Sequence, residues 1–386
     1  MELFVDDARG LEELARRLRR EPAIGLDTEF VGERTYTPVL ELVQVSTREG
    51  TAVVDCRAVG DPGPLFEVLH DPKIEKVLHA GQQDLEILYR LSGKVPAPVF
   101  DTQIAAAMVG LGYQPGYASL VERLLHTRLE KTETLTDWSR RPLSPAQLAY
   151  AHADVRYLLP LREKLLAELR ELGREEWVRE EFDALVDRSL QALPPAGEAY
   201  LRVRGRGGLR KRNLAILREL AAWREEEARR TNKPRQAILS DEILVEIARR
   251  APEKPESLGQ FRPSLSRSLR RYAKPVLEAV RRGARLPAEE WPAVSEPGEI
   301  RVPGVLEVLQ ATLRLCASEA RVAPALVATT ADLRKFLECF GSEASADVPL
   351  LRGWRYDVAG RKLRRLLEGK AALRIDPKTL RLRIEE

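Results

Sequence analysis

Acidic residues at three separate places in the chain have the types and spacing of a metal-binding site. Asp27 and Glu29 follow the apolar run AIGL at spacing i, i+2, which on an extended strand puts both carboxylates on one face. Asp84 lies near the start of an expected helix, and Tyr150 and Asp154 are one helical turn apart. Hard divalent cations such as Mg²⁺ prefer oxygen ligands, which carboxylates supply. Enzymes that hydrolyse phosphodiesters commonly use two such cations, bound by acidic side chains. These residues are therefore candidates for phosphodiester chemistry.

Each of these signals, taken alone, also has an ordinary structural explanation. The Asp27–Glu29 pair fits a solvated strand end, and Asp84 fits the first turn of a helix, where the helix dipole favours an acid. Tyr150 and Asp154 fit a packed tyrosine beside a surface carboxylate. The case for chemistry rests on the occurrence of all three signals, in order, in elements that one fold can bring together.

Several neighbouring residues have weaker claims to a place in the site. Asp101 is expected to form a strand-end turn, although it can also shape the site. We expect His79 to be a core histidine and Phe30 to pack, although Phe30 can also stack on a terminal base. Arg140 and Arg141 are expected to be surface arginines, with phosphate contacts as the alternative.

The first 170 residues have the pattern of a mixed α/β layer. Short β-branched or apolar runs indicate strands over 23–30, 40–47, 51–56, 76–80 and 97–102. Helices are expected over 82–93, over 102–112 and from Ser144 onward, where Ser-Pro fits an N-cap followed by proline at the first helical position. Strands that first run consecutively and then alternate with helices predict a mixed sheet with helices around it.

The charge of the chain is distributed unevenly. Residues 1–170 carry 21 Lys and Arg against 26 Asp and Glu, whereas residues 200–290 carry 23 against 12, a net charge of +11. A basic block of this kind is a candidate surface for a polyanion, and nucleic acid is the commonest one in the cytosol. A solvated, arginine-rich helical surface explains the charge equally well.

Length and composition argue against membrane-spanning, secreted and disulfide-stabilised proteins. The chain has 386 residues, so two or three domains are expected, and no apolar run approaches the ~20 residues that span a bilayer. The start, MELFVDDARG, lacks the features of a signal peptide, which predicts a cytoplasmic protein with no membrane association. Three separated cysteines and four histidines make a disulfide framework or a His–Cys metal site hard to assemble, so a catalytic metal should rest on carboxylates.

The motifs in combination resemble the DEDD exonuclease superfamily. The runs GLDTEFVGERTYTPVLELVQV, HAGQQDLEIL and YAHADVRYLLPL resemble its three exonuclease motifs, and the tyrosine four residues before the last aspartate resembles the tyrosine-type (DEDDy) branch. The runs VFDTQIAA and LEKTETLTDWSRRPLSPAQLAYAHAD, with the helical stretch after Gly208, are similar to the ribonuclease D family. Residues 208–283 resemble an HRDC domain, a helical module that binds nucleic acid, and 303–370 resemble it more weakly.

This resemblance implies an α/β fold and a division into domains. The fold would be a ribonuclease-H-like mixed sheet followed by two small all-α HRDC-type domains. The expected segments are an exonuclease domain over 1–192, an HRDC domain over 205–286, a second HRDC-like domain over 303–370 and a terminal β-hairpin over 371–386.

The resemblance also implies the activity and its residues. Asp27, Glu29, Asp84 and Asp154 would bind two divalent ions, Mg²⁺ or Mn²⁺, and Tyr150 would orient the attacking water. The expected reaction is stepwise 3′→5′ removal of nucleotides from RNA, as 5′-monophosphates. The expected partners are tRNA precursors and other structured RNA 3′ ends; protein partners are unspecified.

Two other functions fit the same sequence. A DNA 3′→5′ exonuclease would use the same acids, because the metals act on the phosphate and not on the sugar. A non-catalytic RNA-binding scaffold would keep the fold without the reaction, although none of the motif residues is missing.

Overall fold

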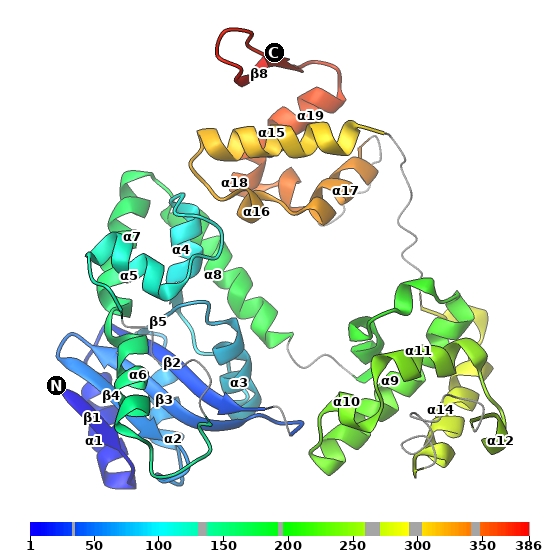
Figure 1. Ribbon diagram of the computed structural model, residues 1–386, viewed down its shortest axis with the longest axis horizontal. Coiled ribbons are helices and arrows are strands. Elements are labelled where there is room, and N and C mark those ends of the chain that lie inside the picture. Colours follow the sequence, from blue (N-terminus) through cyan, green and yellow to red (C-terminus); the bar gives the residue numbers. More distant parts are fainter. Residues whose placement is uncertain are drawn as a thin grey trace. The chain divides into compact units, whose positions relative to one another are not determined.

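The computed structural model describes residues 1–32, 35–129, 137–191, 196–258, 271–292, 303–340 and 348–385 (Figure 1). The chain forms two compact units, which we describe separately: unit 1 comprises residues 1–28, 42–189 and 298–386, and unit 2 comprises residues 29–41 and 190–297. The stretches between the expected domains, 192–205 and 286–303, fall partly outside the described residues. The four domain ranges given above therefore stay a prediction.

A six-stranded mixed sheet is the centre of unit 1, in the order β1-β4-β3-β2-β5-β6. β4 pairs antiparallel with β3, whereas β1 runs parallel to β4, and β5 runs parallel to both β2 and β6. The strands are β1 (Glu2–Val5), β2 (Ala23–Val31), β3 (Val39–Thr47), β4 (Gly50–Asp55), β5 (Glu75–Leu78) and β6 (Val99–Asp101). The mixed sheet with surrounding helices confirms the expected fold class.

Helices pack around this sheet because their apolar residues recur at helical spacing. α1, for example, buries Leu11, Leu14 and Leu18. The helices of this part are α1 (Ala8–Leu18), α2 (Gly63–Leu69), α3 (Gln82–Ser92), α4 (Thr102–Met108), α5 (Tyr117–Leu125), α6 (Pro145–Arg156), α7 (Leu158–Glu171) and α8 (Glu175–Leu190). The long helical run expected from Ser144 is divided at Tyr157, where α6 ends and α7 begins.

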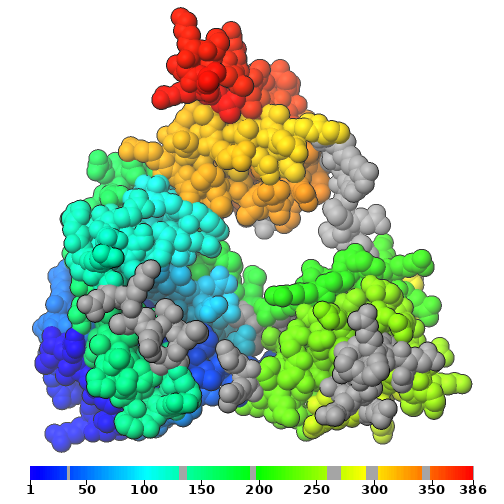
Figure 2. Space-filling view, in the orientation of Figure 1, coloured from blue at the N-terminus to red at the C-terminus, as the bar shows by residue number. Residues whose placement is uncertain are grey.

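A C-terminal helical module also belongs to unit 1 and packs on α4 and α8. The buried Arg174 guanidinium donates to the carbonyls of Met108, at 2.6 Å, and of Arg321, at 3.1 Å. In Figure 2 the orange atoms of the module lie against the cyan atoms of the region that contains α4. Trp354 stacks on Trp177, and its indole nitrogen donates to Glu181 at 3.3 Å. Buried polar and aromatic contacts thus attach the module to the helices beside the six-stranded sheet.

The described elements of this module are mostly short. They are α15 (Val305–Glu319), α16 (Pro324–Val327), α17 (Thr330–Glu338), η4 (Pro349–Leu351), α18 (Gly353–Arg355), η5 (Tyr356–Gly360) and α19 (Arg361–Leu367). An antiparallel hairpin of β7 (Ala372–Ile375) and β8 (Leu382–Glu385) follows, and it lies in the expected terminal segment.

Unit 2 is a bundle of helices together with the segment that links β2 to β3. Its elements are η1 (Ala196–Arg202), η2 (Arg206–Gly208), α9 (Lys211–Thr231), α10 (Arg235–Ile238), α11 (Asp241–Arg250), α12 (Pro255–Leu258), α14 (Ala273–Arg285) and η3 (Ala288–Glu290). Leucine, isoleucine and valine side chains from α9, α11 and α14 form its core. Tyr36 from the linking segment packs against this core, and its hydroxyl donates to Glu225 at 2.5 Å.

The structure also bears on the expected absence of membrane-spanning segments and of disulfides. Among the described residues, no helix is both long and apolar enough to cross a membrane. The three cysteines lie in described ranges, and none of them forms a disulfide.

Candidate active site

Strand β2 places two of the acids that the sequence analysis selected. Its residues alternate between the faces of the sheet, so Asp27 and Glu29 share one face while Thr28 points to the other and is buried. One carboxylate oxygen each from Asp27, Glu29 and Asp154 lie within 4.8 Å of one another. Three acids so close together would repel one another strongly unless a cation or protons compensate the charge. The geometry therefore fits a site for a divalent cation with oxygen ligands.

Helix α6 supplies the third acid of this group and the tyrosine beside it. The helix starts with a capping box, in which Ser144 accepts from the backbone of Gln147 and Gln147 accepts from the backbone of Ser144. Pro145 takes the first helical position, as expected. The cap sets the start of the helix, and one turn later Tyr150 and Asp154 lie on the same face.

A glycine lets the end of α6 approach the sheet closely. A Cβ atom on Gly25 would lie 2.1 Å from Ser46 Oγ and 3.2 Å from Leu158 Cβ. Ser46 in β3 in turn donates to the carbonyl of Val155 at 2.8 Å. The missing side chain thus allows the α6–α7 junction to lie on β2 and β3, which brings Asp154 to Asp27.

Tyr117 in α5 braces the same junction from the other side. Its hydroxyl donates to the carbonyl of Ala153 at 3.1 Å and accepts from the backbone amide of Tyr157 at 3.0 Å. Burial raises the pKa of the Tyr117 hydroxyl far above its usual range, and the negative charges of Asp154 and Asp27 raise it further. Tyr117 therefore stays neutral and holds the turn that carries Asp154.

The acids of the site ionise less readily than ordinary carboxyls. Burial raises the pKa of Asp154 to about 7, although a hydrogen bond from the Tyr150 side chain favours its charged form. A bound divalent cation would lower this pKa, since it would supply the positive charge that the carboxylate lacks. The hydrogen bond also places the Tyr150 hydroxyl directly at the carboxylate group.

Asp84 is the one expected ligand that does not belong to the group of three. It lies in the first turn of α3 and is 8% exposed, and it accepts a hydrogen bond from Thr28 Oγ1 at 2.5 Å. Burial raises the pKa of Asp84, while the bond from Thr28 opposes that shift. Thr28 lies between Asp27 and Glu29 in β2, but its side chain faces away from theirs. Its hydrogen bond therefore holds Asp84 against β2 without making Asp84 part of the group of three.

The weaker candidates prove to have structural contacts. Asp101 forms the N-cap of α4 and also accepts from the backbone amide of Gly81 at 2.8 Å, in agreement with the expected turn role. His79 is half-buried and linked to Thr102 Oγ1 at 2.9 Å, and burial lowers its pKa, which favours the neutral ring. Arg140 is exposed, as expected. Arg141 is different, because it forms an ion pair with the buried Asp55.

Sequence reasoning missed three contributors to this arrangement: Thr28, Tyr117 and Gly25. Thr28 lies inside the first motif, and its alternation with Asp27 and Glu29 was the signal for a side chain on the opposite face. Tyr117 gave no such signal, because its partners are 36 and 40 residues away along the chain.

Comparison with known proteins agrees with this geometry. A family model described as a 3′-5′ exonuclease matches residues 3–170, and one described as an HRDC domain matches residues 213–280. The ribonuclease D of Gluconacetobacter diazotrophicus is 40% identical over 379 residues, which cover 97% of this chain and 95% of that protein. The chain belongs to the ribonuclease D family. The family uses divalent metal ions, and the chain is accordingly a metal-dependent 3′-5′ exoribonuclease.

Two further relatives are similar to this chain over almost their whole length. The ribonuclease D of Granulibacter bethesdensis is 40% identical over 385 residues, with 98% of this chain and 96% of that protein covered. The crystal structure of Escherichia coli RNase D, whose title calls it an exoribonuclease involved in structured RNA processing, superposes with a TM-score of 0.83 at 31% identity. The superposition covers 95% of this chain and 98% of the E. coli chain. Both the exonuclease region and the helical regions thus have counterparts in the family.

Proposed function

We propose that Asp27, Glu29 and Asp154 bind divalent metal at the point of RNA cleavage, with Asp84 as a further ligand and Tyr150 as the residue that orients the water. The observation that supports this most strongly is the close approach of three carboxylate oxygens from β2 and α6. Mg²⁺ and Mn²⁺ are the ions we expect, because both are hard cations that prefer such oxygens. We propose two ions, as in other phosphodiester-cleaving sites of this kind.

The metal would activate water and neutralise charge on the phosphate, and the protein's own residues would set the geometry. Asp27 and Glu29 share one face of β2, so the strand fixes their spacing. Asp154 comes from α6, whose distance from the sheet is set by Gly25 and Ser46. Tyr150 hydrogen-bonds Asp154 and is therefore positioned to hold a water molecule beside it.

For Asp84 to take part, its side chain would have to leave Thr28. Its carboxylate is held by Thr28, whose backbone is continuous with that of Asp27 and Glu29. A rotation of the Asp84 side chain away from Thr28 would bring it toward the same strand end, where the charge of a metal offsets the lost hydrogen bond. We therefore propose Asp84 as the ligand that a bound metal recruits.

The helical regions supply the proposed RNA contacts. The HRDC match at 213–280 lies inside the block 200–290, whose net charge is +11. Such a charge favours the phosphate backbone without reading sequence. We propose that this block holds the body of tRNA precursors and of other structured RNAs, and that single nucleotides leave the 3′ end as 5′-monophosphates. The proposed location is the cytoplasm, where such precursors mature.

One gel tests this proposal. A tRNA precursor with an extended 3′ end is incubated with Mg²⁺ and either the wild-type protein or the Asp27→Asn variant. We expect the wild type to give a ladder that ends near the mature 3′ end, and the variant to leave the precursor intact. Equal degradation by both proteins would overturn the assignment of Asp27.

A single-stranded DNA of matching sequence, run beside the RNA, tests the choice of substrate. We expect the RNA to be degraded faster than the DNA under identical conditions. Faster degradation of the DNA would overturn the RNA assignment while leaving the metal site in place.

A further inference from the structure

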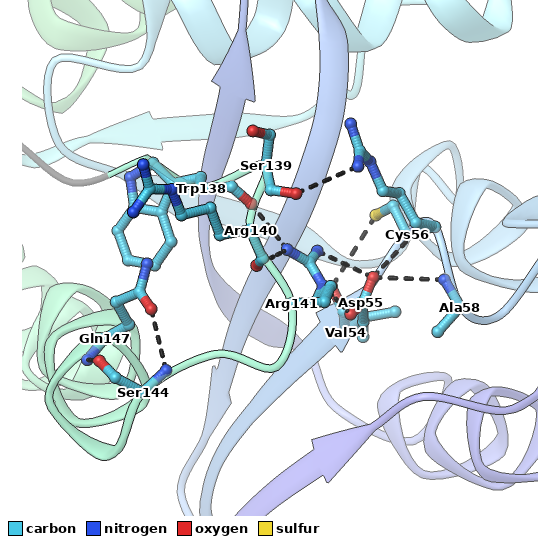
Figure 3. A network of polar contacts seen from close by, with 11 residues as sticks. Val54, Asp55, Cys56, Ala58, Trp138, Ser139, Arg140, Arg141, Ser144 and Gln147 are labelled. Atoms are coloured by element: carbon cyan, nitrogen blue, oxygen red, sulfur yellow. Dashed lines mark hydrogen bonds and ion pairs between the residues drawn. The ribbon is translucent and has the colours of Figure 1, made fainter.

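The segment that precedes α6 is fixed to the end of β4 by an ion pair between residues 86 positions apart (Figure 3). Arg141 donates through Nε to one oxygen of Asp55 and through Nη2 to the other, at 3.0 Å in the second case. The Asp55 side chain is 4% exposed and that of Arg141 is 26% exposed. A two-pronged contact of this kind fixes direction as well as distance.

The same guanidinium also holds the backbone of its own segment. Its Nη1 donates to the carbonyls of Trp138, at 2.7 Å, and Arg140, at 2.9 Å. Arg57 Nη1 donates to the carbonyl between them, that of Ser139, at 3.2 Å. Three consecutive carbonyls are therefore bound by arginine side chains, and Figure 3 shows Arg141 at the centre of this network.

The strand end that carries the ion pair is itself well held. Asp55 accepts from the backbone amides of Arg57, at 3.0 Å, and Ala58, at 3.2 Å, in addition to its bonds with Arg141. Because these amides immediately follow β4, the carboxylate cannot turn away without breaking the turn that ends the strand. Asp55 thus fixes the segment 137–141 relative to the end of β4.

The segment presents one large side chain to the proposed site. Trp138 is 9% exposed, and its ring centroid lies 6.0 Å from that of Tyr150, at an angle of 42° between the planes. Tyr150 in turn hydrogen-bonds Asp154. Tilted aromatic pairs at this separation attract each other and restrict the rotation of both rings.

We propose that Asp55, Arg141 and Trp138 are positioning residues for Tyr150: the ion pair fixes Trp138, and Trp138 holds the tyrosine ring where its hydroxyl meets Asp154. This inference rests on the proposed site. Trp138 and Arg141 act on the orientation of Tyr150 and not on the strength of RNA binding. Their loss should therefore lower kcat and leave KM nearly unchanged.

The first experiment measures kcat and KM on a short single-stranded RNA with saturating Mg²⁺. Trp138→Ala should lower kcat about 10- to 100-fold, because a displaced group near the reacting atoms has an effect of that order. Trp138→Phe, which keeps a ring, should lose less. Arg141→Lys keeps the charge but not the two-pronged contact, so it should also lower kcat. The matched control is Arg140→Lys on the exposed neighbour, which should behave as the wild type.

The second experiment decides whether the effect passes through Tyr150. Trp138→Ala and Arg141→Lys are each combined with Tyr150→Phe, and every variant is checked for cooperative unfolding. We expect each second substitution to lower kcat little further once the hydroxyl is gone. If Trp138→Ala does not fold, the Arg141→Lys pair with Tyr150→Phe gives the same test.

The outcomes separate this inference from the proposed site. If the losses of kcat multiply in the double variants, the residues do not act through Tyr150 and the positioning role is wrong. If Tyr150→Phe alone keeps the wild-type kcat, then Tyr150 has no role to be positioned for, and both proposals about it fail. Both proposals are supported if Tyr150→Phe and the positioning variant each lower kcat alone and the double variant loses little more. If Trp138→Ala and Arg141→Lys alone keep the wild-type kcat, the positioning role is wrong.

Discussion

Two groups of buried or half-buried carboxylates among the described residues differ in the partners that hold them. In the first group, Asp154 is hydrogen-bonded by Tyr150 and Asp84 by Thr28, both neutral hydroxyls. Burial raises the pKa of each of these acids, to about 7 in the case of Asp154. Nothing in these contacts favours the charged form strongly enough to offset the loss of water.

In the second group the partner is an arginine. Burial also opposes ionisation of these acids, yet hydrogen bonds from guanidinium groups hold their pKa below the usual range. The pairs are Asp55 with Arg141, Glu225 with Arg235, and Asp241 with Arg224. The chain thus carries its own cation at these three acids, whereas Asp154 and Asp84, which hydroxyl groups hold, are best compensated by an ion from solution. Substitutions in the two groups should therefore have opposite consequences.

The largest effect is expected from the first group. Asp154→Asn should lower the rate of RNA hydrolysis by about 10³-fold or more, because it removes one of the three carboxylates proposed to bind the catalytic metal. Without metal, its free energy of unfolding should not fall, since the substitution removes a charge that burial disfavours. Rates on a short RNA and urea unfolding measure the two quantities. The exposed Asp183→Asn on α8 is the matched control, and a stability loss with normal hydrolysis would place Asp154 in the structural group.

Asp241→Asn should do the reverse. It leaves Arg224, which is 4% exposed, without its carboxylate, and breaking a buried pair in this way costs about 3–5 kcal/mol. Urea unfolding of unit 2 should show this loss, while the neighbouring exposed Glu242→Gln should unfold as the wild type does. Hydrolysis of a short single-stranded RNA should persist wherever the variant is folded. Equal stability of the two variants would mean that the arginine-paired acids are not structural.

The ion pair of Asp55 makes a prediction about pH. Because the folded-state pKa of Asp55 lies below its ordinary value of about 3.8, the stabilisation is complete above that value and is lost as the pH falls through the folded pKa. The wild type should exceed Asp55→Asn in unfolding free energy by about 1.5–3 kcal/mol at pH 6, the range for hydrogen bonds to a charged group, because Arg141 is partly exposed. The difference should shrink toward pH 3. Urea unfolding at several pH values, without metal, measures it. A difference that stays constant would show that Arg141 does not stabilise the charged form.

The smallest effect is expected at Tyr36. Tyr36→Phe removes one hydrogen bond to Glu225, but the ion pair with Arg235 and the contact of that guanidinium with the ring remain. The loss should be about 0.5–1.5 kcal/mol, as for a single hydrogen bond. The exposed Tyr113→Phe serves as the control in thermal unfolding. A loss as large as that of Asp241→Asn would show that the hydroxyl, and not the arginine, holds Glu225.

Much of the fold and most of the proposed site could be predicted from the sequence, because the signals are local. Asp27 with Glu29, and Tyr150 with Asp154, each share one face of one element, so their spacing alone predicts their direction. The expected strands 23–30, 40–47 and 51–56 correspond to β2, β3 and β4. Strand β1 was missed because ELFV is only four residues long and has no clear alternation.

The remaining features depend on contacts between distant parts of the chain. No local pattern shows that Arg141 meets Asp55, or that Gly25 is needed because Ser46 and Leu158 occupy the space of its side chain. The position of Asp84 outside the group of three is of the same kind, since it depends on a hydrogen bond from Thr28, 56 residues away. Contacts of this kind can be seen only in the folded structure.

The central claim, that Asp27, Glu29 and Asp154 form a metal site, is tested most directly by metal binding itself. Free Mn²⁺ can be followed by its paramagnetic resonance signal while it is titrated into the wild type, Asp154→Asn and the control Asp183→Asn. We predict saturable binding to the wild type and the control, and binding weakened by more than about 10-fold in Asp154→Asn, because loss of a direct ligand should exceed the effect of losing its outer partners. Identical Mn²⁺ binding by all three proteins would contradict the assignment.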